Sequence, residues 1–188
     1  MAITHQKICE AGYINLVFAN PNRKLELYDG EVRVKPGMSF EHGEVVMWLS
    51  QQLLLQLDLR QFKVRMNEGR VRRSPGNVYI PDLIVFPAAY AEFLSGRPGK
   101  LAIIPDPLPL VVEVWSAFTG NYDINAKLPV YQQRGDREIW FIHPYEKTLT
   151  AWRQQQDGTY EETVYQGAES IRPIAMPDVV IDLAALFI

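Results

Sequence analysis

The sequence predicts a mixed α/β fold, with a core ordered helix, strand, strand, strand, helix, strand over residues 40–142. Three observations predict it: two segments with the apolar spacing of helices, short apolar runs typical of buried strands, and a helix placed between two such runs. A helix that joins two strands lets them run parallel, so we expect a partly parallel sheet. We expect an N-terminal β-hairpin and a C-terminal β extension to flank this core.

The composition is that of one globular domain. The 188 residues are 47% hydrophobic, which is enough for one core, so we expect a single domain over 1–188. The net charge of −3 means that any DNA contact needs a local basic patch. The single cysteine, Cys9, excludes an internal disulfide and a cysteine-based zinc site. No run resembles a membrane span or a signal peptide, so we expect a cytoplasmic protein.

The first elements are a short helix and a hairpin. Apolar residues within 1–22 indicate a helix that ends before Asn20-Pro21-Asn22, because these residues interrupt helices. Residues 25–28 and 31–34 both alternate apolar and polar side chains. The dipeptide between them, Asp29-Gly30, suits the tight turn of a hairpin.

A long helix and further strands follow. Ser39 is a suitable N-cap for a helix that runs to about Leu57, and the apolar residues between them recur on one wide face. Residues 62–66 alternate as a strand does, and 67–69 then turn the chain. A second strand around Val71 would complete a basic hairpin.

Two apolar runs, 78–86 and 110–115, are each interrupted by one carboxylate, Asp82 and Glu113. A buried strand normally reads as continuous Val, Ile and Leu. An isolated ionised carboxylate inside such a strand costs several kcal/mol unless something compensates it. Two carboxylates on neighbouring strands are suited to sharing a hard divalent cation, which prefers oxygen ligands.

The remaining elements follow from proline, glycine and apolar patterning. Residues 87–109 hold five prolines and predict a surface excursion with a short helix near 88–94. A helix over 122–134 would end at Gly135. Pro129 lacks the N–H that a helix interior needs, so this helix should kink there or begin near Ala126. We predict a strand at 138–142, a hairpin of 148–153 with 159–165, and an apolar tail over 179–188 that packs on the core.

An ordered set of short motifs resembles one known family. These motifs are Leu25-Glu-Leu-Tyr-Asp-Gly-Glu31, His42, Pro81-Asp82, Leu110-Val-Val-Glu-Val114 with Ser116 and Thr119, Asp123…Lys127…Tyr131, and Gly135-Asp-Arg-Glu-Ile-Trp140 followed by His143-Pro144. In this order and spacing they resemble the Uma-two family, a group of prokaryotic nucleases in the PD-(D/E)XK superfamily. The resemblance implies a restriction-endonuclease-like mixed sheet, an αβββαβ core and hydrolysis of DNA.

The resemblance also implies a metal site. Asp82 and Glu113 would hold Mg²⁺ or Mn²⁺, helped by the backbone carbonyl of Val114. Most members of the superfamily carry a lysine two residues after the second acid, where this chain has Trp115. The family pattern implies that Lys127, on the following helix, takes its place and orients water or steadies the phosphate.

Other residues have both a functional and a structural interpretation. His42 can ligate metal or contact the scissile region, or simply start a helix. Glu26 is either at the rim of the site or on the polar face of the hairpin, and Asp123 and Tyr131 are expected to support the lysine helix. Basic residues of the expected hairpin are either phosphate contacts or a solvated surface: Arg65, Arg70, Arg72 and Arg73.

The sequence leaves three functions open. The first is a Mg²⁺- or Mn²⁺-dependent DNA endonuclease, with DNA as its partner and no membrane. The second is a module that binds DNA or another partner and keeps the fold without turnover. The third is glycosidase-like use of the two carboxylates, which needs no metal. A homodimer or higher homo-oligomer is compatible with each of them.

Overall fold

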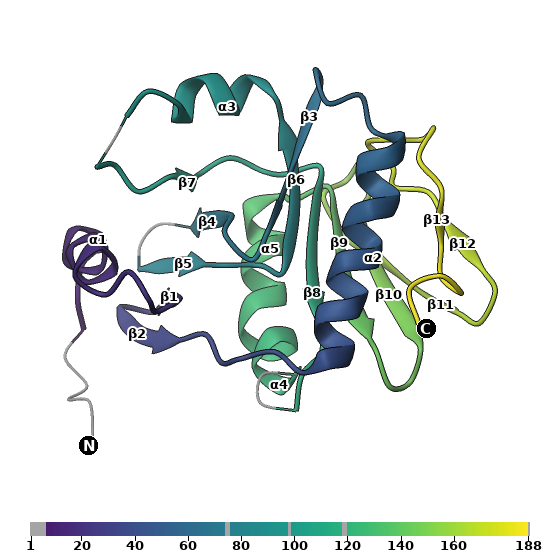
Figure 1. Cartoon of the computed structure of the whole chain (residues 1–188), viewed down its shortest axis with the longest axis horizontal. Coiled ribbons are helices and arrows are strands. Elements are labelled where there is room, and N and C mark those ends of the chain that lie inside the picture. Colours follow the sequence, from purple (N-terminus) through teal and green to yellow (C-terminus); the bar gives the residue numbers. More distant parts are fainter. Residues whose placement is uncertain (1–6, 74–75, 98, 118–119, 188) are drawn as a thin grey trace.

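The computed structural model describes residues 7–73, 76–97, 99–117 and 120–187, and their strands form two main sheets (Figure 1). The larger sheet has six strands in the order β11-β10-β9-β8-β6-β3. Strands β8 and β9 are parallel, and the other neighbours in this sheet are antiparallel, which confirms the partly parallel sheet. Its strands are β3 (Phe62–Met66), β6 (Leu83–Pro87), β8 (Leu110–Val114), β9 (Glu138–His143), β10 (Thr148–Gln154) and β11 (Tyr160–Gln166).

Helices pack on both faces of the six-stranded sheet because its strands are apolar on both sides. Helix α2 (Phe40–Gln56) packs its buried residues, such as Leu49, with Leu83 on one face. Helix α5 (Leu128–Arg134) packs Tyr131 with Ile84 on the other. This arrangement confirms the predicted αβββαβ core as α2, β3, β6, β8, α5 and β9.

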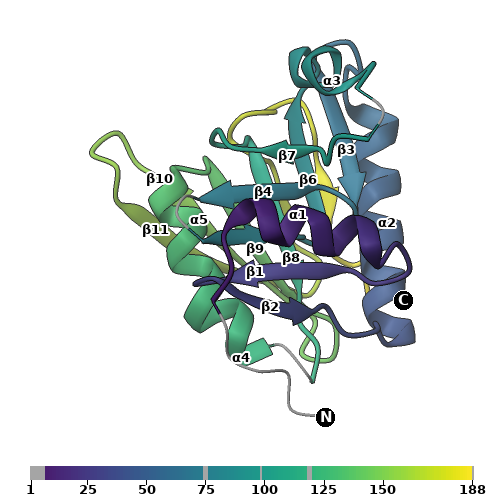
Figure 2. The same cartoon turned by 90° about the vertical axis from the view of Figure 1, so that its left-hand side faces the viewer.

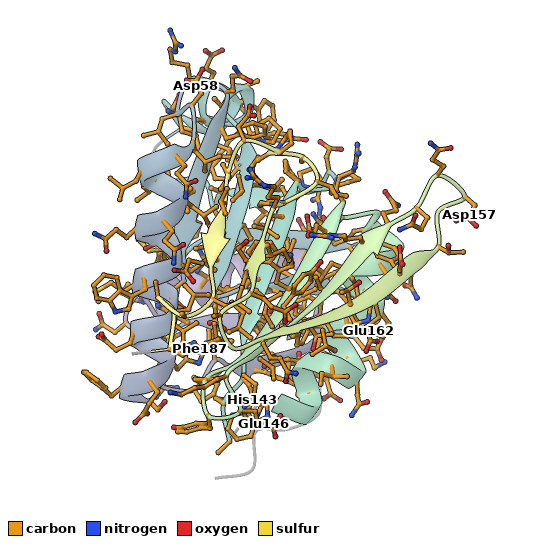
Figure 3. The ribbon with its side chains drawn as sticks, turned by 90° about the vertical axis from the view of Figure 1, so that its right-hand side faces the viewer. Asp58, His143, Glu146, Asp157, Glu162 and Phe187 are labelled. Atoms are coloured by element: carbon orange, nitrogen blue, oxygen red, sulfur yellow. The ribbon has the colours of Figure 1, made fainter. Side chains whose placement is uncertain are left out.

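The predicted C-terminal β extension is also present. Strands β10 and β11 form a hairpin with Asp157 at its tip (Figure 3). The last residues form a small sheet of β12 (Ser170–Ile171) and β13 (Ile181–Asp182). Apolar residues of this tail join the core on the α2 side, with Phe187 packed against it.

The second sheet has five strands, in the order β2-β1-β5-β4-β7. Its strands are β1 (Leu25–Tyr28), β2 (Glu31–Val34), β4 (Arg70–Arg73), β5 (Asn77–Tyr79) and β7 (Ile103–Ile104). Helix α1 (Glu10–Ala19) covers one face of this sheet and runs along its strands (Figure 2), and Tyr13 and Val17 pack against Leu27. The predicted β1–β2 hairpin is confirmed, and it belongs to a sheet rather than standing alone.

Two predictions about strand pairing are wrong. Residues 78–86 are not one strand: β5 belongs to the second sheet and β6 to the first, and the chain changes sheet at Pro81, which has no N–H for a ladder. Asp82 therefore precedes a strand rather than interrupting one. Strands β3 and β4 do not form a hairpin either, because β3 pairs with β6 while β4 pairs with β5 and β7.

The helical crossover between β8 and β9 widens in its middle. It comprises α4 (Gly120–Tyr122), a π-helical turn, η1 (Asp123–Lys127), and α5. The Leu128 N–H donates to the Asp123 carbonyl five residues back, and Pro129 follows in the first turn of α5. Among the described residues the helical crossover is first seen at Gly120. Pro129 lies in the first turn of α5, as the second predicted arrangement placed it, although α5 begins at Leu128 and is preceded by the π-turn. Gly135 ends it with φ of 78°, as predicted.

The other helices agree with the sequence patterns. The Ser39 hydroxyl accepts from the His42 N–H and caps α2. Helix α3 (Ala89–Leu94) lies in the proline-rich excursion. None of the helices in the described ranges is long and apolar enough to cross a membrane.

Candidate active site

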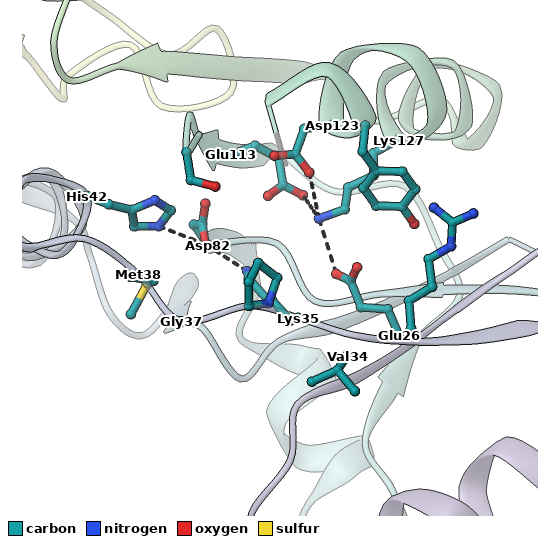
Figure 4. A pocket seen from close by; sticks show the side chains of 14 residues that line it. Glu26, Val34, Lys35, Gly37, Met38, His42, Asp82, Glu113, Asp123 and Lys127 are labelled. Atoms are coloured by element: carbon teal, nitrogen blue, oxygen red, sulfur yellow. Dashed lines mark hydrogen bonds and ion pairs between the residues drawn. The ribbon is translucent and has the colours of Figure 1, made fainter. Parts of the chain in front are cut away.

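A pocket of about 310 Å³ lies where the two sheets, the start of α2 and the π-turn meet. Its polar lining includes four carboxylates, two lysines, an arginine and a histidine (Figure 4). The charged and histidine side chains are Glu26, Arg33, Lys35, His42, Asp82, Glu113, Asp123 and Lys127. The segment 33–38, which leaves β2, forms one wall.

Strand register places Asp82 opposite Glu113. Leu83 of β6 pairs with Val112 of the antiparallel β8, so the next pair outward is Asp82 with Glu113. Opposed residues of an antiparallel pair project from the same face of the sheet. Both carboxylates are about 1% exposed and both line the pocket.

Asp82 has a partner on each carboxylate oxygen. Oδ1 lies 2.7 Å from Lys35 Nζ, and Oδ2 accepts from the Val114 N–H at 2.7 Å. Burial raises the pKa of Asp82, but the Lys35 ammonium and His42 outweigh burial and hold it well below its ordinary value. Asp82 is therefore ionised. The predicted metal role of the Val114 carbonyl stays a prediction, since the described contact uses the amide.

Glu113 receives two donors on the same oxygen. Oε1 lies 3.1 Å from Lys127 Nζ and 2.5 Å from the Tyr131 hydroxyl. Burial raises the pKa of Glu113 to about 8, with Lys127 opposing the rise and the Asp123 and Asp82 carboxylates adding to it. The two acids of the pair thus differ: one is ionised at neutral pH and the other largely retains its proton.

Lys127 is the buried cation between three acidic side chains. Its Nζ lies 3.1 Å from Glu113, 3.2 Å from Glu26 and 3.1 Å from Asp123, which is four residues earlier (Figure 4). Burial lowers the pKa of Lys127, but these carboxylates outweigh burial and raise it well above its ordinary value. Lys127 is therefore charged and points into the pocket.

Glu26 joins this group from the second sheet. It is 3% exposed on β1, and its Oε1 also accepts from the Ile80 N–H at 2.9 Å. This hydrogen bond ties β1 to the segment that leads to Asp82. Glu26 therefore helps to fix the relative position of the proposed metal ligand and the lysine.

His42 enters the pocket from the first turn of α2. It is 3% exposed, and its Nε2 lies 3.2 Å from Asp82 Oδ1. That approach is not aligned for a hydrogen bond, and within the described ranges neither ring nitrogen has a hydrogen-bond partner. A buried imidazole without a partner is unfavourable unless a ligand completes the site.

Lys35 was not among the residues predicted for the site. It follows the hairpin, where a lysine before proline has no signal that separates it from a solvated residue. Lys35 and Lys127 supply the compensation that the sequence argument assigned to a metal alone. A shared cation is therefore not required to explain why Asp82 and Glu113 are buried, because each has a lysine partner within the protein.

The four predicted phosphate-contacting arginines do not line this pocket. Arg72 pairs with Glu10 at 2.8 Å, and the exposed Arg65 lies over the Phe86 ring. Arg65 and Arg70 line a different pocket between β3, β4 and α3, and Arg73 ends β4. Because β3 and β4 lie in different sheets, these side chains do not form one hairpin surface.

Trp115 occupies the position of the usual strand lysine without lining the pocket. Its ring stacks on His143 at a centroid distance of 4.4 Å and meets Tyr145 edge to face. Strand β8 has ended one residue earlier, so Trp115 belongs to an aromatic cluster beside the pocket. Thr119, which is part of the family pattern, lies outside the described residues.

The donor set suits a hard divalent cation. Asp82, Glu113 and His42 bring oxygen and imidazole donors to one pocket, and Mg²⁺ commonly binds through one or two carboxylates with water completing its shell. No three His, Cys, Asp or Glu side chains of the described chain already form a complete ligand cluster. A cation would therefore bind mainly through the two carboxylates and water.

The αβββαβ core and mixed sheet define the class of the protein, which is that of the restriction-endonuclease-like fold. The chain belongs to the Uma2 family, described as "Putative restriction endonuclease", whose model matches residues 11–184.

Solved structures share the fold. Four solved chains match, including the crystal structure of a "putative nuclease belonging to DUF820" from Anabaena variabilis ATCC 29413. That chain is 17% identical, with a TM-score of 0.71 over 88% of this chain and 90% of the other. No curated protein matches.

Proposed function

We propose that this protein is a Mg²⁺- or Mn²⁺-dependent DNA endonuclease whose active site contains Asp82, Glu113 and Lys127. The observation that carries the proposal is the convergence of these three side chains in one pocket, although they come from three separate elements. Family membership and the fold support the class of substrate.

The proposed roles follow from charge and position. A bound cation would polarise the phosphoryl oxygen and lower the pKa of a water ligand. Asp82 and Glu113 would hold the cation, and Glu113 would release its proton to solvent on binding it. Lys127 then steadies the phosphate or orients the attacking water, and Asp123 and Glu26 keep its ammonium in place.

Tyr131 and His42 complete the machinery. The Tyr131 hydroxyl donates to Glu113 and fixes the orientation of that carboxylate. His42, beside Asp82, offers a nitrogen to the cation or to a water on it. Both are assigned here as groups that orient the reacting centre.

Nicking of supercoiled plasmid tests the proposal. The purified chain should nick plasmid with Mg²⁺ or Mn²⁺, and EDTA should stop the reaction. Glu113→Gln should lose at least about 100-fold in rate, as expected when a charge-stabilising group is removed. Glu161→Gln, at an exposed glutamate of β11, is the matched control. If the wild-type protein nicks no plasmid with Mg²⁺ and none with Mn²⁺, the proposal is wrong.

A second candidate is a non-catalytic DNA-binding module. The Lys35–Asp82 and Lys127–Glu113 contacts favour it, because both acids already have partners within the protein without a metal. The same assay separates the candidates: the module binds DNA and cuts none. Glycoside hydrolysis, the third possibility, would be insensitive to EDTA.

A further inference from the structure

Arg33 differs from the other cations of the pocket. Lys127 contacts three carboxylates and Lys35 contacts Asp82, so both ammonium groups are neutralised inside the protein. Arg33 lines the same pocket from β2 and is exposed. Within the described chain it has no ion pair, and its close contacts are two tyrosine rings.

The two rings hold the Arg33 guanidinium at a defined place. Its Cζ lies 4.5 Å from the centroid of Tyr28 and 4.7 Å from that of Tyr122. The rings meet edge to face at 5.6 Å, so they form a rigid support. A guanidinium held over aromatic faces keeps its charge and its forked N–H donors available to an anion.

Tyr122 adds a second donor. Its hydroxyl is buried, lines the same pocket and has no hydrogen-bond partner in the described chain. Burial raises the pKa of Tyr122, with the Glu26 carboxylate adding to the rise, so the hydroxyl keeps its proton. Tyr122 directly precedes the π-turn that carries Lys127, and its ring centroid lies 5.7 Å from Lys127 Nζ.

We infer that Arg33 and the Tyr122 hydroxyl bind a backbone phosphate of the DNA strand, next to the phosphate held at Asp82, Glu113 and Lys127. Arginine recognises phosphate oxygens through parallel N–H donors, and a buried hydroxyl gains a partner on binding. The inference deepens the proposed nuclease function and rests on it. The phosphate contact would therefore lie in the pocket, and not at the arginines for which the sequence suggested it: Arg65, Arg70, Arg72 and Arg73.

Fluorescence anisotropy with labelled DNA duplexes tests the inference. Two duplexes of unrelated sequence are titrated with the full chain in Ca²⁺ and in EDTA, over a series of salt concentrations. Arg33→Met should weaken binding roughly tenfold, because a hydrogen bond to a charged group is lost, and should reduce the salt slope by about 1. The loss should be equal for both duplexes, since phosphates carry no sequence information.

Three further variants separate the contributions of the Tyr122 hydroxyl, the charge of Arg33 and its guanidinium geometry to DNA binding. Tyr122→Phe keeps the ring under Arg33 but removes the hydroxyl, so we expect weaker binding with an unchanged salt slope. Arg33→Lys keeps the charge and should restore the slope but only part of the affinity. Arg60→Met, at an exposed arginine paired with Asp58, should bind as wild type does.

The outcomes distinguish this inference from the proposed function. If wild type binds DNA and Arg33→Met binds equally well with the same salt slope, the Arg33 site is wrong and the nuclease proposal stands. If wild type binds neither duplex with or without Ca²⁺, both fail. Thermal melting of each variant confirms that it is folded, and Tyr90→Phe controls for a tyrosine distant from the pocket.

Discussion

The ammonium of Lys35 lies 2.7 Å from Oδ1 of Asp82, an oxygen that the proposed function assigns to a divalent cation. Lys35 Nζ also donates to the Ile80 carbonyl at 2.6 Å, and its side chain is only 9% exposed. The Lys35 ammonium therefore occupies the position beside Asp82 where a bound metal ion is expected. A metal that binds Asp82 has to displace this ammonium or share the carboxylate with it.

Lys35→Met should therefore tighten Mn²⁺ binding. The variant removes a positive charge and a competitor from Asp82, so we expect the Kd to fall roughly tenfold, as for one charge pair in a partly buried site. Isothermal titration calorimetry without DNA measures it. Lys24→Met, at a partly exposed lysine outside the pocket, is the control. An unchanged or weaker Kd in Lys35→Met would show that Lys35 does not compete.

Lys127→Met should separate turnover from metal binding. Its removal leaves Glu26, Glu113 and Asp123 without their shared cation, so the metal-free protein should lose about 3–5 kcal/mol of unfolding free energy. Mn²⁺ should restore part of this stability. Single-turnover cleavage should fall at least about 100-fold while Mn²⁺ still binds. Cleavage at the wild-type rate would remove Lys127 from the mechanism; Lys100→Met, at an exposed lysine, is the control.

Glu113→Gln should leave the metal-free fold intact and abolish its response to metal. The pKa of Glu113, raised to about 8 by burial, means that this side chain is mostly neutral at pH 7, and glutamine copies that state. The melting temperature should change by less than about 3 °C, which corresponds to roughly 1 kcal/mol in a chain of this size. Mn²⁺ should stabilise wild type but not the variant. Equal stabilisation of both proteins would exclude Glu113 as a ligand.

Mn²⁺ affinity should rise with pH. The pKa of Glu113 lies near 8 in the folded chain and near 4.5 ordinarily, so its contribution to stability is present below pH 4.5 and lost as pH rises through about 8. Metal binding requires the ionised form and releases a proton. Affinity should therefore increase up to roughly tenfold per pH unit between about pH 6 and pH 8, then level off. Calorimetry in buffers of different ionisation enthalpy counts the proton; a flat profile would contradict this assignment.

The two acids could be predicted because local patterns mark them, whereas Lys127 was predicted from the resemblance to the Uma-two family. Asp82 and Glu113 stand out against apolar neighbours, and register then brings them together. Asp123 and Lys127 have helical i, i+4 spacing, which the π-turn keeps on the pocket side. The core order αβββαβ followed from the same periodicities.

The strand pairing and the cations of the pocket other than Lys127 could not be predicted, because they depend on long-range packing. Whether residues 78–86 form one strand or two depends on which sheets the halves join, and local propensity does not encode that choice. Lys35 and Arg33 resemble solvated residues of a hairpin end until the second sheet brings them to the pocket. The arginines of β3 and β4 were grouped by proximity in sequence, yet their strands pair with different partners.

Anomalous diffraction from Mn²⁺-soaked crystals tests the central claim most directly. We predict one strong peak between the carboxylates of Asp82 and Glu113, with Lys35 moved off Asp82 Oδ1, and no such peak in Glu113→Gln. The account would be contradicted if wild-type crystals bound Mn²⁺ at full occupancy elsewhere but showed no peak at this pair, with the Lys35–Asp82 contact intact.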